Sequence, residues 1–372
     1  MTVDFGLRFI VEPTAPVLSS EEAELLRELR PAGVMFRSRN FVQNVPYPEW
    51  RALFAKLLSD VRTAIGREKI VVSIDHEGGR VHRFPAPVTR FPYPAFYGQS
   101  LEAVESVSRA MATELRSLGF NLSCSPCADI HSNSENPVIN QRAFGVTAHA
   151  VSEGALRCAR TLRKEGIMPC AKHFPGHGDT GTDSHYSLPV LNRSREELYD
   201  REFVPFKALI DDGIEMIMTA HIVVPQLDEA RQATISPVLL RSILREELGF
   251  RGVTVADALG MQAIRDDVSS ADFATRAHQA GLDLFLFVGD PVSIKDAIAT
   301  RDALKVTHAA GHISTESLLE VEGRVNAFVA TLGQYPVVEL SADTFAEHAR
   351  LAESLTHNAP FSPFHFEPKG FD

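Results

Sequence analysis

Short apolar runs alternate with amphipathic segments over most of the chain. Runs that are apolar on both faces are typical of parallel strands covered by helices on both sides. They predict strands at Val3–Ile10, Gly33–Phe36, Ile70–Ile74, Phe120–Cys124, Gly166–Ala171, Glu215–Thr219, Gly252–Ala256 and Leu284–Phe287. The segments between them predict helices from about Ser20 and over Trp50–Ile65, Leu101–Leu118, Ala148–Glu165, Ser194–Asp211, Pro237–Leu248 and Ala271–Gly281.

Eight strands that alternate with helical segments predict an α/β fold of the (β/α)8 TIM-barrel type. A doubly wound open sheet is the alternative, but no Gly-x-Gly-x-x-Gly pattern follows an early strand. Beyond about Ala330 the alternation stops. We therefore expect a single barrel domain over residues 1–335 and a C-terminal extension over 336–372, which contains a helix at Ser341–Thr356 and a tail rich in Pro and Phe.

The composition is that of an ordinary globular protein, with 44% hydrophobic and 23% charged residues. A net charge of −11 and scattered Lys and Arg argue against binding to nucleic acid or to a membrane surface. No signal peptide is visible, and no apolar run approaches the roughly 20 residues of a membrane helix. The four cysteines lie in or beside apolar segments, and Cys124-x-x-Cys127 has no second such pair to complete a zinc site. Buried thiols in a reducing compartment are the favoured interpretation, so we expect a cytoplasmic protein.

Titratable side chains crowd into the loop Lys172–His185, whose glycines and proline are incompatible with a helix or strand. A polar surface loop is one interpretation, and a metal site of His173, His177, Asp183 and His185 is another, although no HExxH helix or CxxC pair supports it. We favour general acid/base chemistry by Asp183 and His185. In an extended segment both side chains point to the same side, so the carboxylate can raise the pKa of the imidazole and make it a proton donor near neutrality.

Other polar residues follow the C-terminal ends of predicted strands: Asp75, Lys172, His173, His221 and Asp257. In a barrel these ends share one face, which is the catalytic face of known TIM-barrel enzymes. His221 is expected to be a supporting or structural histidine rather than a reacting one. The convergence predicts one polar site at this face.

Plainer roles are open for several of these residues. Asp257 could cap the following helix, and Lys172 could be a Schiff-base lysine. Asp75 and Glu77 could bind a divalent ion, although Glu77 precedes two glycines and is expected to tie down its own loop. His177 is open between loop support and contact with a leaving group.

Five motifs carry a resemblance to a known family. They are Lys172–Gly178 with Asp183–His185, Asp75–Phe84, Pro137–Gly145, Thr219–His221 and Ala256–Leu259. Through them, over about residues 5 to 300, the chain resembles glycoside hydrolase family 3, and within it the bacterial β-N-acetylglucosaminidases of peptidoglycan recycling.

The resemblance implies a retaining exo-β-N-acetylglucosaminidase. In this interpretation Asp257 is the nucleophile and His185 is the acid/base, oriented by Asp183. The residues expected to hold the terminal GlcNAc are Asp75, Arg83, Arg142, Lys172 and His173.

The implied substrate is GlcNAc linked β-1,4 to 1,6-anhydro-N-acetylmuramic acid, with or without a stem peptide. Neither a metal nor an organic cofactor is expected, nor any nucleic-acid or membrane partner, and the chain is expected to be a monomer or a homodimer. Two alternatives remain: a phosphorylase of the same family, and a non-catalytic sugar-binding barrel. The second is disfavoured because binding alone needs no nucleophile.

Overall fold

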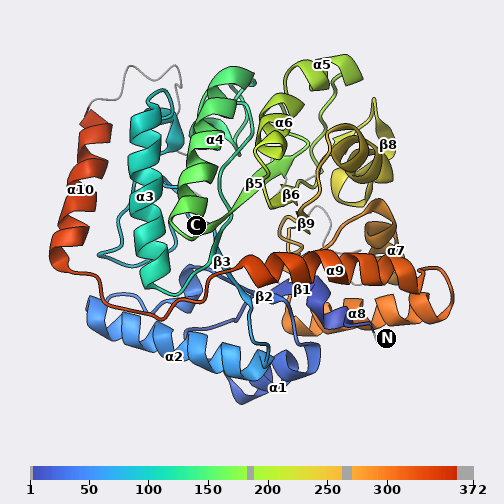
Figure 1. The fold of residues 1–372 in the computed structure, drawn as a ribbon, viewed down its shortest axis with the longest axis horizontal. Coiled ribbons are helices and arrows are strands. Elements are labelled where there is room, and N and C mark those ends of the chain that lie inside the picture. Colours follow the sequence, from blue (N-terminus) through green and yellow to red (C-terminus); the bar gives the residue numbers. More distant parts are fainter. Residues whose placement is uncertain (1–2, 182–187, 262–269, 291, 358–372) are drawn as a thin grey trace.

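The computed structural model describes residues 3–181, 188–261, 270–290 and 292–357, which are built around one parallel eight-stranded sheet (Figure 1). Its strands are β1 Phe9–Val11, β2 Gly33–Phe36, β3 Val71–Ile74, β4 Leu122–Ser123, β5 Met168–Phe174, β6 Met216–Thr219, β9 Val253–Ala256 and β10 Phe285–Phe287, in the order β10-β1-β2-β3-β4-β5-β6-β9. The amide of Leu284 donates to the Thr254 carbonyl at 2.9 Å, and the amide of Ala256 donates to the Leu284 carbonyl at 3.0 Å. These bonds join the two ends of the sheet. The predicted (β/α)8 barrel is confirmed, and the open-sheet alternative is wrong.

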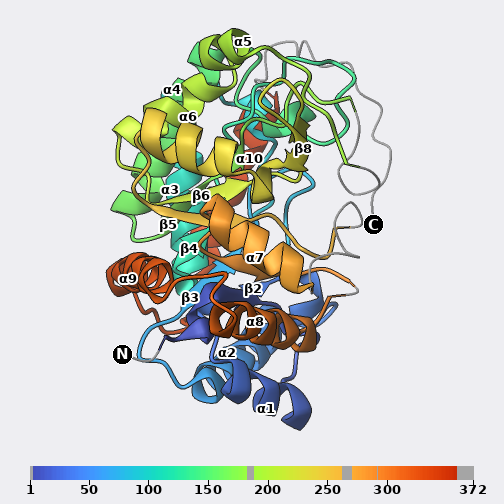
Figure 2. The same cartoon turned by 90° about the vertical axis from the view of Figure 1, so that its right-hand side faces the viewer.

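Helices surround the barrel, as the two perpendicular views show (Figures 1 and 2). They are α1 Ser20–Leu29, α2 Tyr47–Ile65, α3 Leu101–Ser117, α4 Ala148–Lys164, α5 Arg195–Asp200, α6 Phe203–Asp211, a π-helix Val238–Glu247, α7 Ala271–Ala280, α8 Ile294–Ala309, α9 Thr315–Thr331 and α10 Ala342–His357. A hairpin of β7 Val223–Val224 and β8 Asp228–Gln232 precedes the π-helix.

Some local predictions differ from the structure. The first strand begins at Phe9 rather than Val3, because Phe5–Arg8 forms a 3-10 helix. The predicted helix Ser194–Asp211 has its expected capping box but is divided into α5 and α6 at Arg201, whose backbone leaves the helical region. Helices α8 and α9 and the β7–β8 hairpin were not predicted.

Helix α9 closes the end of the barrel opposite the predicted catalytic face. It packs against residues at the starts of the strands: the Lys69 ammonium, just before β3, donates to the Ala330 carbonyl at 2.7 Å. The amide of Asp4, ahead of β1, donates to the Glu322 carboxylate at 3.0 Å. The apolar residues of this helix continue the barrel core, and they are Val321, Val325, Phe328 and Val329. This end of the barrel is therefore sealed by packing.

The predicted helix at Ser341–Thr356 is present as α10, which lies beside α3 (Figure 1). The Phe345 ring meets the edge of Tyr47 on α2, with ring centroids 5.2 Å apart. His348 Nδ1 lies 2.6 Å from the buried carboxylate of Glu114 on α3. The Pro- and Phe-rich tail lies outside the described residues, and the division at 335/336 stays a prediction.

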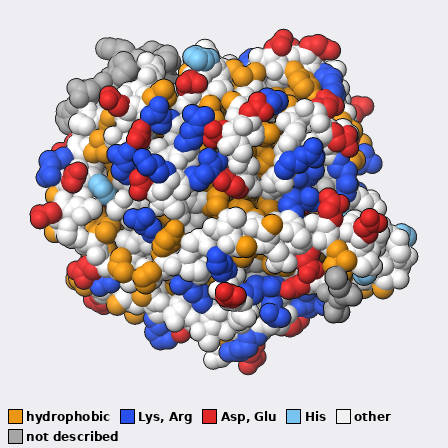
Figure 3. Space-filling view, in the orientation of Figure 1, with side chains coloured by type: hydrophobic (Ala, Val, Ile, Leu, Met, Phe, Trp, Pro, Cys, Tyr) orange, Lys and Arg blue, Asp and Glu red, His pale blue; other side chains and the backbone are white. Residues whose placement is uncertain are grey.

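Acidic and basic side chains are interspersed on the face shown in Figure 3. Ion pairs between side chains of opposite charge include Arg163–Glu215 at 2.6 Å and Arg160–Asp212 at 2.7 Å. Within the described ranges, no helix is both long enough and apolar enough to span a lipid bilayer. All four cysteines are buried free thiols, as predicted.

The packing of α9 generates a stability prediction. Phe328→Ala should lower the free energy of unfolding by about 3 kcal/mol or more, because it opens a cavity beneath the barrel. Urea denaturation followed by circular dichroism measures the effect. Asn326→Ala, at an exposed position of the same helix, is the matched control and should leave the midpoint almost unchanged. Equal midpoints for the two variants would contradict the role of α9.

Candidate active site

Charged side chains from β5 and from the loop after β3 meet at the predicted catalytic face. Lys172 lies in β5, and its Nζ contacts Asp75 Oδ1 at 2.6 Å and Glu77 Oε1 at 2.5 Å. Burial alone lowers the pKa of Lys172, but the two carboxylates outweigh burial and raise it above its ordinary value. The amine is therefore held as a cation. This opposes the Schiff-base alternative, which needs a neutral nucleophilic amine.

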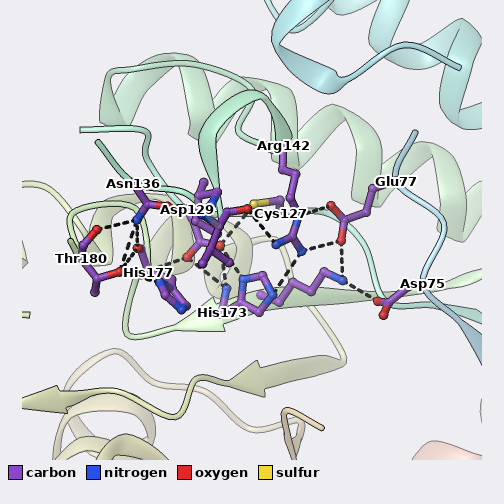
Figure 4. Close-up of polar contacts among 12 residues, drawn as sticks. Asp75, Glu77, Cys127, Asp129, Asn136, Arg142, His173, His177 and Thr180 are labelled. Carbon is purple, nitrogen blue, oxygen red and sulfur yellow. Dashed lines mark hydrogen bonds and ion pairs between the residues drawn. The ribbon is translucent and has the colours of Figure 1, made fainter. Parts of the chain in front are cut away.

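Glu77 joins this lysine to Arg142, which ends the 3-10 helix Asn140–Arg142 in the loop after β4. Arg142 Nε donates to Glu77 Oε2 and Nη2 donates to Oε1, both at 2.8 Å. The Glu77 side chain is 1% exposed. Burial raises its pKa, but the charges of Arg142 and Lys172 outweigh burial and hold the pKa well below its usual range. Glu77 thus anchors two predicted sugar-binding residues as well as its own loop (Figure 4).

His173 is oriented by a carboxylate that the sequence analysis did not single out. Its Nδ1 lies 2.6 Å from Asp129 Oδ2, and its Nε2 lies 3.4 Å from Arg142 Nη2. Asp129 is completely buried. A carboxylate can only accept, so His173 Nδ1 carries a proton and Nε2 points toward the guanidinium (Figure 4).

His177 supports the loop that begins after β5. Its amide donates to Asp129 Oδ1 at 2.7 Å, and its Nδ1 lies 2.8 Å from Thr180 Oγ1. Asn136 Nδ2 donates to the carbonyls of His177 and Thr180 at 2.8 and 2.9 Å. Burial, followed by the electrostatic effect of the neighbouring His173 ring, lowers the pKa of His177 to about 4. These contacts support the loop-support role for His177.

Asp257 directly follows β9, and its amide donates to the Thr219 carbonyl at 3.0 Å. Its Oδ1 accepts a hydrogen bond from the Ala258 amide at 2.7 Å. Burial raises the pKa of this carboxyl, but the neighbouring His173 and His221 rings, the Ala258 amide and the Lys172 ammonium outweigh it and lower the pKa. The site therefore holds Asp257 as a carboxylate, the form that a nucleophile requires.

His221 contacts the backbone of Asp257, in agreement with the supporting role expected for this histidine. Its Nε2 lies 3.2 Å from the Asp257 carbonyl oxygen, and its Nδ1 lies 2.8 Å from Thr234 Oγ1. The alternative in which Asp257 caps the next helix is wrong. Residues 258–261, which follow Asp257, are not helical, and the next helix in the described part of the chain is α7, whose N-cap Ser270 accepts from the Phe273 amide.

The remaining predicted residues are placed less tightly or lie outside the described ranges. Arg83 Nη2 is 3.9 Å from Asp75 Oδ2, too far for a hydrogen bond, and the two side chains are 28% and 25% exposed. Both groups thus remain accessible for a ligand. Asp183 and His185 lie outside the described residues, so the acid/base roles expected for them stay predictions.

One group in the described part of the chain has ligand atoms close enough for a metal ion: Cys127, Asp129 and His173. Hydrogen bonds already join them, because Cys127 Sγ donates to Asp129 Oδ2 at 3.2 Å and His173 Nδ1 shares the same oxygen. A metal ion would have to displace both protons. The arrangement of Cys127, Asp129 and His173 therefore fits a hydrogen-bonded cluster better than a metal centre.

Comparisons with known proteins identify the family. The model of the Glycosyl hydrolase family 3 N terminal domain matches residues 7–321. The chain belongs to glycosyl hydrolase family 3. A beta-hexosaminidase of Methylococcus capsulatus is 36% identical over 296 residues, which cover 77% of this chain and 85% of that protein. One from Neisseria gonorrhoeae is 32% identical over 336 residues, which cover 85% and 90%.

Solved structures agree with this assignment. The family 3 β-N-acetylglucosaminidase of Paenibacillus sp. str. FPU-7 superposes with a TM-score of 0.86 at 32% identity, covering 96% of this chain and 68% of that one. NagZ from Neisseria gonorrhoeae, in complex with N-trifluoroacetyl-D-glucosamine, gives 0.73 at 28% identity and covers 93% and 97%. This family 3 chain is a glycoside hydrolase, and its relatives support β-N-acetylglucosaminidase activity. The non-catalytic alternative is therefore not supported.

The loop after β3 of this family 3 enzyme also contains two adjacent histidines, of which His76 is buried and His82 is half-buried. His76 and His82 have ring centroids 5.2 Å apart, and His82 Nε2 lies 3.0 Å from the Phe84 carbonyl oxygen. Burial, followed by the charge of Arg90, lowers the pKa of His82 from 6.5 to about 4. Burial also lowers the pKa of His76 well below its ordinary value.

These histidines predict a loss of stability in acid. The unfolded chain protonates His82 near pH 6.5 and the folded chain near pH 4, so between these values the unfolded state binds more protons. The free energy of unfolding should fall as the pH drops from 6.5 toward 4. His82→Gln should reduce this dependence, as measured by urea midpoints at pH 7 and pH 5. His149→Gln, at an exposed position, should keep the dependence of the unmodified protein. If both variants have the same pH dependence, His82 does not contribute.

Proposed function

We propose that the enzyme is a retaining exo-β-N-acetylglucosaminidase that releases terminal GlcNAc from cell-wall muropeptides. The observation that carries the proposal is Asp257, an ionised, half-buried carboxylate at a strand end, beside the cluster of Lys172, Arg142 and His173. A nucleophile must be placed rigidly, and a strand end provides this better than a loop. The β-hexosaminidase relatives support the same activity.

The mechanism has two steps. The Asp257 carboxylate attacks C1 of the sugar while His185, held by Asp183, protonates the departing glycosidic oxygen. The C1–O bond to the leaving group breaks, and a covalent glycosyl-enzyme forms. A water molecule, deprotonated by His185, then attacks C1, which releases GlcNAc and restores the Asp257 carboxylate.

The polar cluster is suited to holding one terminal sugar. Asp75 offers acceptors to sugar hydroxyls, while Lys172, Arg83 and Arg142 offer donors. His173 presents Nε2 on the same side as the Arg142 guanidinium. Ion pairs with Glu77 hold the side chains of Lys172 and Arg142 in fixed positions before the sugar binds. Such preorganisation reduces the entropy lost on binding.

The finer assignments are part of the same proposal. The substrate is GlcNAc joined to 1,6-anhydro-N-acetylmuramic acid, with or without its peptide, and the reaction takes place in the cytoplasm. No metal or organic cofactor takes part in these steps.

The activity is tested by release of 4-nitrophenol from the aryl β-N-acetylglucosaminide, with the aryl β-glucoside in parallel. We expect hydrolysis of the acetamido sugar alone, unaffected by EDTA or added phosphate. Formation of GlcNAc-1-phosphate when phosphate is present would identify a phosphorylase instead. Absence of release from both sugars would contradict the proposed substrate class.

Substitution of the reacting residues tests the mechanism. Asp257→Asn should lower kcat roughly 1,000-fold or more while GlcNAc still binds, since the fold and the sugar contacts are kept. His185→Ala should slow the disaccharide roughly 100-fold or more but the 4-nitrophenyl glycoside far less, because a good leaving group needs little protonation. Equal losses of His185→Ala on both substrates would contradict the acid/base assignment.

A further inference from the structure

Asp129 lies at the centre of the hydrogen bonds behind the proposed sugar-binding site. It is completely buried in the loop after β4 and accepts from three residues (Figure 4). Oδ2 receives His173 Nδ1 at 2.6 Å and Cys127 Sγ at 3.2 Å, while Oδ1 receives the His177 amide at 2.7 Å. The His173 amide lies 3.2 Å from both oxygens. No role in the reaction described above requires this carboxylate directly.

The two ring nitrogens of His173 have different surroundings, and these determine where its proton lies. Nδ1 faces a carboxylate oxygen, which can only accept, so Nδ1 must donate. Nε2 faces Arg142 Nη2 at 3.4 Å, and a guanidinium can only donate. The neutral Nδ1–H tautomer satisfies both neighbours. The opposite tautomer would place a proton on Nε2 against the guanidinium and a lone pair on Nδ1 against Asp129.

We propose that Asp129 is a positioning residue that fixes His173 in the Nδ1–H tautomer, so that the Nε2 lone pair accepts a hydrogen bond from a hydroxyl of the bound sugar in place of the long, 3.4 Å contact with Arg142 Nη2. The proposal rests on the proposed function, because it requires that His173 contacts the sugar. The contact with Asp129 accounts for the orientation of the His173 ring and makes Nε2 the acceptor, rather than the donor, of the hydrogen bond to the sugar.

The geometry makes Asp129→Asn a selective probe. The amide has the shape of the carboxylate and can keep its oxygen on the His177 amide. Its NH2 group would then face His173 Nδ1 and donate to it, which forces the proton onto Nε2 beside Arg142. The substitution therefore reverses the direction of one hydrogen bond with little change in volume, as in other cases where a carboxylate sets the imidazole tautomer.

A double-mutant cycle tests whether Asp129 acts through His173. Asp129→Asn and His173→Ala should each lower kcat/KM on the aryl acetamido glycoside roughly 10- to 100-fold, the scale of one lost polar contact to the substrate. Combined, they should cost little more than His173→Ala alone. A merely structural Asp129 would give losses that multiply. Cys127→Ala, which removes a different donor to the same carboxylate, is the control and should stay within about threefold of the unmodified enzyme.

The tautomer can be read directly in the unmodified protein by long-range 1H–15N correlation of 15N-histidine-labelled samples, with His173→Ala used to assign the signal. We expect a protonated Nδ1 and an unprotonated Nε2. The opposite pattern would overturn the proposal, whether or not Asp129→Asn folds. If the aryl glycoside is not cleaved, the proposed function fails. Calorimetric titration of the same variants with GlcNAc then completes the cycle as a binding measurement, and GlcNAc affinity that is unaltered by Asp129→Asn would also overturn the proposal.

Discussion

The buried carboxylate of Glu77 is the interaction on which the rest of the site depends. It joins Lys172 of β5 to Arg142 of the loop after β4, while Glu77 itself belongs to the loop after β3. Three consecutive βα units therefore converge on two oxygen atoms. Two cations so deeply buried would repel each other and lose their hydration if this carboxylate were absent. The interaction is as much a requirement for folding this end of the barrel as a feature of ligand binding.

The two ends of the barrel are organised by different forces. At the end where the strands begin, α9 seals the core with apolar residues such as Val325 and Phe328. At the other end, the strands end in Lys172, His173 and Asp257, so that charge pairs and hydrogen bonds take the place of packing. Such polar networks fix side-chain directions more narrowly than apolar contacts do, because each bond has a preferred geometry. Apolar packing therefore stabilises one end of the barrel, and the charged and polar groups available for chemistry lie at the other end.

The sequence was sufficient for the barrel strands and for several of the polar residues that the described part of the chain brings together at their ends. Apolar runs gave all eight barrel strands, and the rule that polar residues at strand ends meet on one face located Asp75, Lys172, His173 and Asp257. The same rule could have drawn attention to Asp129, which follows the fourth strand after a short loop. Its importance comes from contacts with His173 and with the His177 amide, which are far away in the sequence.

Other features were not accessible from local patterns. Helix α9 follows the last of the alternating strands and helices and belongs to no βα unit. A prediction based on that alternation therefore stops before α9, although the apolar residues of this helix recur at helical spacing. The loop after β5 fits against the loop after β4 only because position 178 is glycine, since a Cβ there would lie 1.7 Å from the Ile130 carbonyl oxygen. A pattern search registers Gly178 as a loop residue and cannot tell that a neighbouring backbone excludes a side chain.

Three carboxylates of the site differ in how far their oxygen lone pairs are occupied by hydrogen bonds, and this difference supports the different roles proposed for them. Glu77 accepts from Arg142 twice and from Lys172 once, and Asp129 accepts from His173, His177 and Cys127. Among the described residues, the Asp257 carboxylate accepts one hydrogen bond, from the Ala258 amide. The neighbouring histidine rings and the Lys172 ammonium lower its pKa further. A carboxylate saturated with donors is stabilised and unreactive, whereas one held ionised mainly by the surrounding field keeps lone pairs free to attack. The distribution of hydrogen bonds therefore supports the role proposed for Asp257 as the nucleophile, while the other two carboxylates hold the groups around it.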